Sequence, residues 1–176
     1  MKTNIALIGF MGTGKTAVGK ALAERLDKKF IELDPLIERK AGKTIPEIFS
    51  QDGEIAFREL EIEVAKEVAQ GKNQVIACGG GVVLNKINID RLRKESLIVY
   101  LTASPQIILE RTSNDAEERP LLKVASPRLT IRELLRFRKP FYERAADIKI
   151  DTSKLDINAV VEQIITKIKE NEGLNS

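Results

Sequence analysis

Residues 9 to 16 read Gly-Phe-Met-Gly-Thr-Gly-Lys-Thr, which matches the pattern of a phosphate-binding loop in full. A short apolar strand precedes the pattern and a helix follows, which argues against a glycine-rich turn that only starts a helix. Glycines let backbone N–H groups converge on phosphate oxygens, and the helix start adds a positive dipole end. Lys15 can reach the β- and γ-phosphates, and the Thr16 hydroxyl is placed to ligate Mg²⁺. We therefore predict a nucleotide site that includes Gly12, Thr13, Gly14, Lys15, Thr16 and Ala17.

Two carboxylates, Glu32 and Asp34, stand at the end of the predicted strand 29–33. Side chains alternate along a strand, so we expect both on one face, close to the phosphate loop. There they could serve a metal ion and a substrate hydroxyl. The strand 74–78 lacks the terminal acid of many phosphate-loop NTPases, which leaves Glu32 and Asp34 as the nearest carboxylates. The alternatives are solvated acids or, for Asp34, a cap of the helix that starts at Pro35.

A helix at 53–70 places Arg58 beside its apolar stripe. Its guanidinium could hold a carboxylate, or it could form an ion pair with Glu54 or Glu61 at helical spacing. The glycine triplet 79–81 follows a strand and allows close approach of a ligand to the backbone, although a plain flexible turn is the alternative.

Two further arginines lie beyond the middle of the chain. Arg119 falls in the polar stretch 112–128, which we interpret as a lid loop. From there it could stabilise charge over the phosphates, or it could be a solvated loop cation. Arg138 lies in a helix that a capping-box pattern at Thr130 and Glu133 is expected to open. It could be a second anchor for a carboxylate, with a surface arginine as the alternative.

The elements that must position these residues alternate between apolar runs and segments of helical period. This order predicts parallel crossovers and an α/β fold of three layers, an α/β/α sandwich. In such sheets ligands bind beyond the carboxyl ends of the strands. The predicted strands are 4–8, 29–33, 74–78, 97–101 and 148–150, and the predicted helices are 16–26, a short one opened by Thr44 and Glu47, 53–70, 105–111, 130–146 and a closing helix that includes 157–168.

Composition excludes several kinds of chemistry. The chain has no histidine and one cysteine, Cys78, so imidazole catalysis, an internal disulfide and a cysteine-built metal site are excluded. Cys78 is interpreted as a small buried residue. A length of 176 residues fits one domain, and a net charge of +3 is too mild to indicate a nucleic-acid partner. Neither a signal peptide nor a membrane span is recognisable, so we expect a cytoplasmic protein, and the lack of an interface stripe favours a monomer.

In this order the motifs resemble the shikimate kinase family, within the nucleoside-monophosphate-kinase-like group of phosphate-loop folds. They follow the family order over essentially the whole chain, which makes the set far more specific than one motif. The matching segments are 9–19, Asp34 with 37–38, 45–49, 53–54, 57–59 with Glu61, 79–84, 119–122, and Arg138 with Pro140, Tyr142, Glu143 and Asp147.

The resemblance implies that ATP, with Mg²⁺, phosphorylates the 3-hydroxyl of shikimate in the pathway to chorismate and the aromatic amino acids. It implies a P-loop NTPase fold with a five-stranded parallel sheet of order 2-3-1-4-5. A single kinase domain, 1–176, would contain a substrate-binding region at about 34–61 and a lid at about 112–128.

The resemblance also implies roles for individual residues. Asp34 would bind the 3-hydroxyl and is the candidate for taking its proton. Lys15 and Arg119 would complete the catalytic set, with Arg119 closing over the phosphates. The remaining roles are substrate binding by Arg58, Arg138, Gly79, Gly80 and Gly81, adenine contacts by Arg111 and by the loop around Thr152 and Ser153, and metal binding by Thr16 and, through water, Glu32.

Three positions depart from the family pattern. Glu32 stands where aspartate is usual, Pro35 where a small polar residue is usual, and no proline follows Ile150. A gluconate or nucleotide kinase on the same fold remains a rival, although neither a second base pocket nor a reason for pairing Arg58 with Arg138 is apparent for them. A GTPase switch would carry Asn-Lys-x-Asp to read guanine, and the chain lacks that motif.

Overall fold

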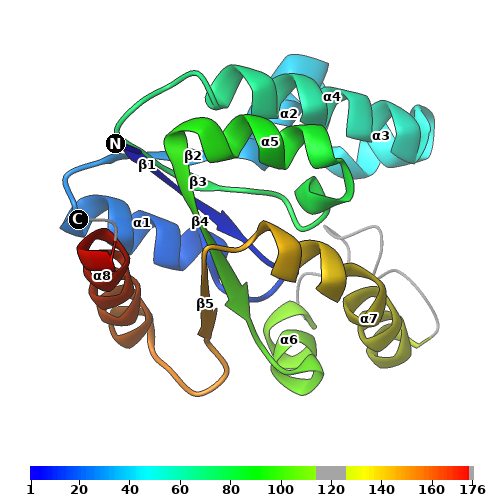
Figure 1. Ribbon diagram of the computed structural model, residues 1–176. Helices are drawn as coiled ribbons and strands as arrows, with labels where there is room; N and C mark the ends of the chain where they lie inside the picture. The colour runs from blue at the N-terminus through cyan, green and yellow to red at the C-terminus, as the bar shows by residue number, and fades with distance from the viewer. Residues whose placement is uncertain (114–125, 175–176) are drawn as a thin grey trace.

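The computed structural model describes residues 1–113 and 126–174, so Arg119 and most of the predicted lid lie outside the described residues. A parallel sheet of five strands forms the centre of the molecule (Figure 1), in the order β2-β3-β1-β4-β5. The predicted fold and strand order are confirmed. The strands are β1 (Asn4–Ile8), β2 (Lys29–Glu32), β3 (Gln74–Ala77), β4 (Ser96–Thr102) and β5 (Ile148–Asp151).

Helices cover both faces of the sheet and make it the middle of three layers. On one face lie α1 (Lys15–Arg25) and α8 (Ile157–Leu174), and on the other lie α4 (Gly53–Val68), α5 (Lys86–Glu95) and α7 (Pro127–Ala145). All residues of β1 and β3 are buried, because parallel strands between two helical layers bury both of their faces. None of the helices in the described residues is long and apolar enough to cross a membrane.

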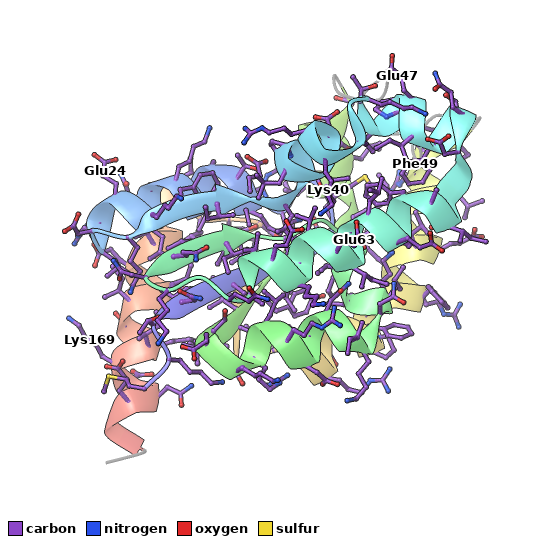
Figure 2. All side chains as sticks on the ribbon, turned by 90° about the horizontal axis from the view of Figure 1, so that it is seen from above. Glu24, Lys40, Glu47, Phe49, Glu63 and Lys169 are labelled. Atoms are coloured by element: carbon purple, nitrogen blue, oxygen red, sulfur yellow. The ribbon has the colours of Figure 1, made fainter. Side chains whose placement is uncertain are left out.

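A second group of helices builds a wall beside the sheet. It consists of α2 (Leu33–Ala41), α3 (Ile45–Gln51) and the first part of α4. In Figure 2, α2 and α4 lie side by side, and Lys40 of α2 forms ion pairs with Glu63 and Glu67 of α4. The predicted capping box is present at the start of α3, where Thr44 Oγ1 accepts from the N–H of Glu47 and Glu47 accepts from the N–H of Thr44.

The second strand is shorter than predicted, and this changes the setting of Asp34. The strand ends at Glu32 and α2 begins at Leu33, so Asp34 lies in the first turn of a helix and not on a strand end. Asp34 is also not the helix cap, because Glu32 occupies that position. Pro35 fits inside this first turn, where the N–H that proline lacks would have no partner within the helix.

Other predicted boundaries were also wrong. The helix α7 begins at Pro127, not at Thr130, and the Thr130 hydroxyl donates to the Ser126 carbonyl instead of forming a capping box. The third strand ends at Ala77, one residue before Cys78. A 3₁₀ turn, η1 (Val82–Leu84), and the helix α5 were not predicted. The remaining helix, α6 (Pro105–Thr112), begins after Ser104, whose side chain accepts from the N–H of Ile107.

Candidate active site

The phosphate loop joins β1 to α1 at the carboxyl edge of the sheet. Gly14, immediately before α1, has a φ of 95°, which favours glycine. Gly12 is packed so tightly against α6 that an added Cβ would lie 2.7 Å from Cγ2 of Thr112. The ammonium of Lys15 donates to the carbonyls of Gly9 and Phe10 at 2.7 and 2.9 Å, so it lies over the loop.

A cavity of about 300 Å³ opens beside this loop, and we call it the phosphate pocket. Thr13 does not line it, because its side chain is buried and donates to the Phe10 carbonyl at 2.8 Å. The predicted residues Gly12, Gly14, Lys15, Thr16, Ala17 and Arg111 do line it, together with Met11, Glu32, Asp34 and residues 77–80.

A second cavity of about 630 Å³, the acceptor pocket, lies between the phosphate loop and the helices α2, α3 and α4. The two pockets share five lining residues and therefore adjoin, with Asp34 in the wall of both. A phosphoryl group in one and a hydroxyl in the other would meet beside this carboxylate. The shared residues are Met11, Glu32, Asp34, Gly79 and Gly80.

Glu32 and Thr16 contact each other directly. The hydroxyl of Thr16 donates to Oε1 of Glu32 at 2.8 Å, across the gap between α1 and the end of β2. Mg²⁺ prefers oxygen donors and usually keeps several waters beside one or two protein ligands and substrate phosphates. A hydroxyl and a carboxylate at the phosphate pocket fit that requirement. No group of three or more acidic, cysteine or histidine side chains in the described part of the chain offers a separate metal cage.

Arg58 forms ion pairs within its helix and also lines the acceptor pocket. Its guanidinium donates to Glu61 at 3.0 Å and to Glu54 at 3.3 Å, so the predicted ion pairs are present. It also lines the acceptor pocket, and its Nε is buried without a hydrogen-bond partner among the described residues. The guanidinium lies against the backbone of Gly81, where an added Cβ would be 2.6 Å from its Cζ.

Arg138 reaches the same pocket from α7. Its side chain is buried, with 3% of the residue exposed, so the alternative of a surface arginine is wrong. The guanidinium lies over the ring of Phe10, 5.6 Å from its centroid. None of the ion pairs in the described residues includes Arg138, and its Nε has no hydrogen-bond partner there. A buried cation of this kind is suited to an anionic ligand.

Glu61 lines the acceptor pocket, although in the sequence it was matched to the family without a role beyond an ion pair with Arg58. It is fully buried, and burial raises its pKa, with a further contribution from nearby Asp34, while Arg58 opposes the shift. The two carboxylates flank Gly79, whose added Cβ would lie 3.0 Å from Oδ1 of Asp34 and 3.1 Å from Oε2 of Glu61. The signal that could have found it is an acid three residues after Arg58 on the buried side of the helix.

The glycine turn is held from α7 as well. Tyr142, fully buried one helical turn after Arg138, donates its hydroxyl to the carbonyl of Gly80. Its ring stacks on Tyr100 of β4 with centroids 5.0 Å apart. Burial raises the pKa of Tyr142 far above its usual range and that of Tyr100 to about 12, so both hydroxyls stay protonated. One face of α7 thus supplies a cation to the pocket and an anchor for its glycine wall.

Three other residues considered in the sequence differ in their positions. Arg111 lines the phosphate pocket from α6, and its predicted contact with adenine stays a prediction. Ser153 lines neither pocket, and its hydroxyl accepts from the N–H of Ser104 at 2.9 Å. Cys78 is buried, and burial raises its pKa to about 12, so it remains a thiol and agrees with the interpretation of a small buried residue.

Known proteins are similar to this chain in sequence and in fold. The family model described as shikimate kinase matches residues 11–169. The chain belongs to the shikimate kinase family. The shikimate kinase of Caldanaerobacter subterraneus subsp. tengcongensis is 50% identical over 162 residues, which cover 92% of this chain and 94% of the relative. That of Thermodesulfovibrio yellowstonii is 49% identical over 173 residues, covering 98% and 97% of the two chains.

Solved structures agree with the sequence comparison. A shikimate kinase from Acinetobacter baumannii, solved in complex with shikimate, superposes with a TM-score of 0.93 at 39% identity, covering 97% of this chain and 95% of that one. The predicted family and the prediction of an ATP-dependent kinase are confirmed. The roles of individual residues in the shikimate kinase site remain predictions.

Proposed function

We propose that this chain transfers the γ-phosphoryl group of ATP, with Mg²⁺, to the 3-hydroxyl of shikimate, which gives shikimate 3-phosphate and ADP. The observation that carries the proposal is the placement of Asp34 where the phosphate and acceptor pockets meet. Membership of the shikimate kinase family and similarity to an enzyme solved with shikimate support the acceptor.

The acceptor pocket has the chemistry that shikimate requires. A cyclic acid with three hydroxyls needs a cation for its carboxylate and acceptors for its hydroxyls. Arg58 and Arg138 converge on the glycine turn from different helices and would hold the carboxylate together with backbone N–H groups of residues 79–81. Asp34 would accept a hydrogen bond from the 3-hydroxyl and take its proton as the oxygen attacks.

Phosphoryl transfer depends mainly on position and charge. Lys15 would leave the loop carbonyls for the phosphates, while Thr16 and Glu32 would hold Mg²⁺, Glu32 through water. When bound, Mg²⁺ neutralises charge on the phosphates. Arg119 keeps its proposed role of closing over them, and Arg111 its proposed place near adenine.

The first test is the dependence of ADP release on the acceptor. We expect the protein with ATP and Mg²⁺ to release ADP rapidly when shikimate is added, and only slowly without it or with gluconate in its place. A coupled assay for ADP measures the rates. Equal rates with and without shikimate would contradict the acceptor assignment, and a preference for gluconate would favour the rival sugar-acid kinase.

The second test concerns the metal. We expect Glu32→Gln to raise the Mg²⁺ concentration for half-maximal rate by about 10- to 100-fold, the usual cost of losing an outer partner of a metal site. The amide keeps the shape of Glu32 but removes the charge that faces Thr16. A titration of initial rate against Mg²⁺ at saturating substrates measures the change.

The matched control is Glu24→Gln, because Glu24 is exposed on α1 and lines neither pocket (Figure 2). The control should keep the Mg²⁺ dependence of the wild type. If Glu32→Gln did so as well, Glu32 would have no part in holding the metal.

We further infer a cytoplasmic monomer without nucleic-acid or membrane partners. The large apolar side chains that are exposed within the described residues are spread over several elements, and such scattered residues need no partner to cover them. Light scattering during size-exclusion chromatography measures the molar mass in solution. The mass of a dimer at every protein concentration would contradict the monomer. Among the exposed residues are Ile55 on α4, Ile87 on α5, and Leu129 and Phe137 on α7.

A further inference from the structure

Thr152, the first residue after β5, is a buried polar residue with an unusual set of partners. Only 2% of it is exposed. Its hydroxyl lies 3.0 Å from the carbonyl oxygen of Thr13 in the phosphate loop and 3.0 Å from that of Thr102 at the end of β4. The backbone N–H of Thr152 also donates to the Thr102 carbonyl, at 2.8 Å. Thr152 therefore joins the ends of two strands to a loop that is 139 residues away in the sequence.

Arg111 completes this arrangement from α6. Its Nη1 donates to the Thr152 hydroxyl and to the Gly12 carbonyl, both at 3.1 Å, and its Nη2 donates to the Thr152 carbonyl at 2.9 Å. Two consecutive carbonyls of the phosphate loop, those of Gly12 and Thr13, are thus held by Arg111 and Thr152. Both anchors are on the side of the loop that faces β4, β5 and α6.

Anchoring a carbonyl also orients the N–H on the far side of the same peptide. A trans peptide is planar, so its C=O and N–H point in opposite directions. The peptide between Thr13 and Gly14 is trans. Its carbonyl is the acceptor for the single proton of the Thr152 hydroxyl, because the Thr102 carbonyl already accepts from the Thr152 N–H. The N–H of Gly14 must then point away from Thr152. Gly14 lines the phosphate pocket and, without a side chain, cannot restrict its own backbone.

We propose that Thr152 is a positioning residue for nucleotide binding: its hydroxyl fixes the Thr13–Gly14 peptide so that the Gly14 N–H faces the phosphates, and it holds Arg111 in place at the same time. This inference rests on the proposed nucleotide site at the phosphate loop. The residue that follows β5 would then contribute to phosphate binding, in addition to any contact between the loop around Thr152 and adenine.

The test compares Thr152→Val with Thr152→Ser. Valine keeps the shape but leaves the Thr13 carbonyl without its donor, whereas serine keeps the hydroxyl. Calorimetry with ADP and Mg²⁺ gives the dissociation constant of each variant, and calorimetry with shikimate serves as the internal reference. We expect valine to weaken ADP binding about 10- to 100-fold, the scale of one buried group left unpaired. The serine variant should bind ADP nearly as tightly as the wild type. The affinity for shikimate should change little in either variant.

Kinetics separate positioning from a general loss of structure. In Thr152→Val the KM for ATP should rise while the KM for shikimate stays near that of the wild type. The ¹⁵N–¹H resonance of Gly14 in the ADP complex should shift in the valine variant and return in the serine variant. Thr166→Val, at an exposed site on α8, controls for the loss of a hydroxyl elsewhere.

The outcomes are distinct. Equal ADP affinity in Thr152→Val and the wild type would overturn the inference, as would equal weakening of ADP and shikimate in a folded variant. Failure of the wild type itself to bind ADP would instead refute the proposed nucleotide site. If the valine variant does not fold, Thr152→Cys, with similar size and a weak donor, takes its place. If Thr152→Cys bound ADP as tightly as Thr152→Ser, the positioning role of Thr152 would be refuted. Weaker binding of ADP by Thr152→Cys would support that role.

Discussion

Replacing Asp34 by asparagine is expected to lower kcat by about 100- to 10,000-fold, the range that a single general base contributes. The amide has nearly the same size and can still bond a hydroxyl, but it cannot take the proton as the 3-hydroxyl attacks. Glu32 is the other carboxylate that lines both pockets, but it already accepts a hydrogen bond from the Thr16 hydroxyl on the phosphate side, so we expect it not to replace Asp34. The affinity for ATP should remain close to that of the wild type. Steady-state kinetics and calorimetry with ATP measure the two quantities.

Asp52→Asn is a suitable control for this prediction. Asp52 precedes α4, is paired with Lys43 at 2.8 Å, and lines neither pocket. Its replacement should leave kcat unchanged. If the kcat of Asp34→Asn were similar to that of Asp52→Asn, Asp34 would be excluded as the base. A second consequence is electrostatic: with the charge of Asp34 removed, the pKa of Glu61 should fall.

Replacing Arg138 by methionine is expected to change binding and stability in opposite directions. The KM for shikimate should rise by about 30- to 1,000-fold, because one partner of a buried charge pair is lost. Stability should be unchanged or higher by about 1–4 kcal/mol, since an apolar side chain of similar length replaces a buried cation with no ion-pair partner among the described residues. Kinetics measure the first effect, and denaturant unfolding without ligand measures the second.

Arg136 provides the matched position on the same helix. It is exposed and lines neither pocket, so Arg136→Met should alter neither the KM for shikimate nor the stability to a comparable degree. A clear loss of stability in Arg138→Met would mean that the arginine supports the fold. An unchanged KM would mean that it does not hold the substrate.

The fold could be predicted largely because its strands are buried on both faces. The strands β1, β3 and β4 appear as apolar runs, and the segments between them have the period of helices. The helix α5 was missed because only Ile89 and Leu92 give it an apolar stripe. Its third buried residue is the polar Asn88, whose side chain donates to the Val82 carbonyl at 3.1 Å.

Some residues of the candidate site could be predicted from the sequence and others could not. The phosphate loop is a local pattern and could be recognised without knowing the rest of the chain. Arg58 and Arg138 are far apart in sequence, so only resemblance to a family suggested that they share a pocket. The buried positions of Glu61 and Thr152 depend on contacts between distant elements, and an acid or a threonine at such a place looks like a surface residue in the sequence. Arg119 remains a prediction because it lies outside the described residues.

The stacked pair of Tyr100 and Tyr142 has an optical consequence. The chain contains two tyrosines and no tryptophan, so light absorbed beyond the phenylalanine band is emitted by this pair. Because the Tyr142 hydroxyl donates to the Gly80 carbonyl in the wall of the acceptor pocket, the tyrosine emission comes from one place in the molecule. Both phenols stay protonated at ordinary pH, so their signal is free of tyrosinate. We therefore expect ligand binding in the acceptor pocket to change the tyrosine emission of the unlabelled protein.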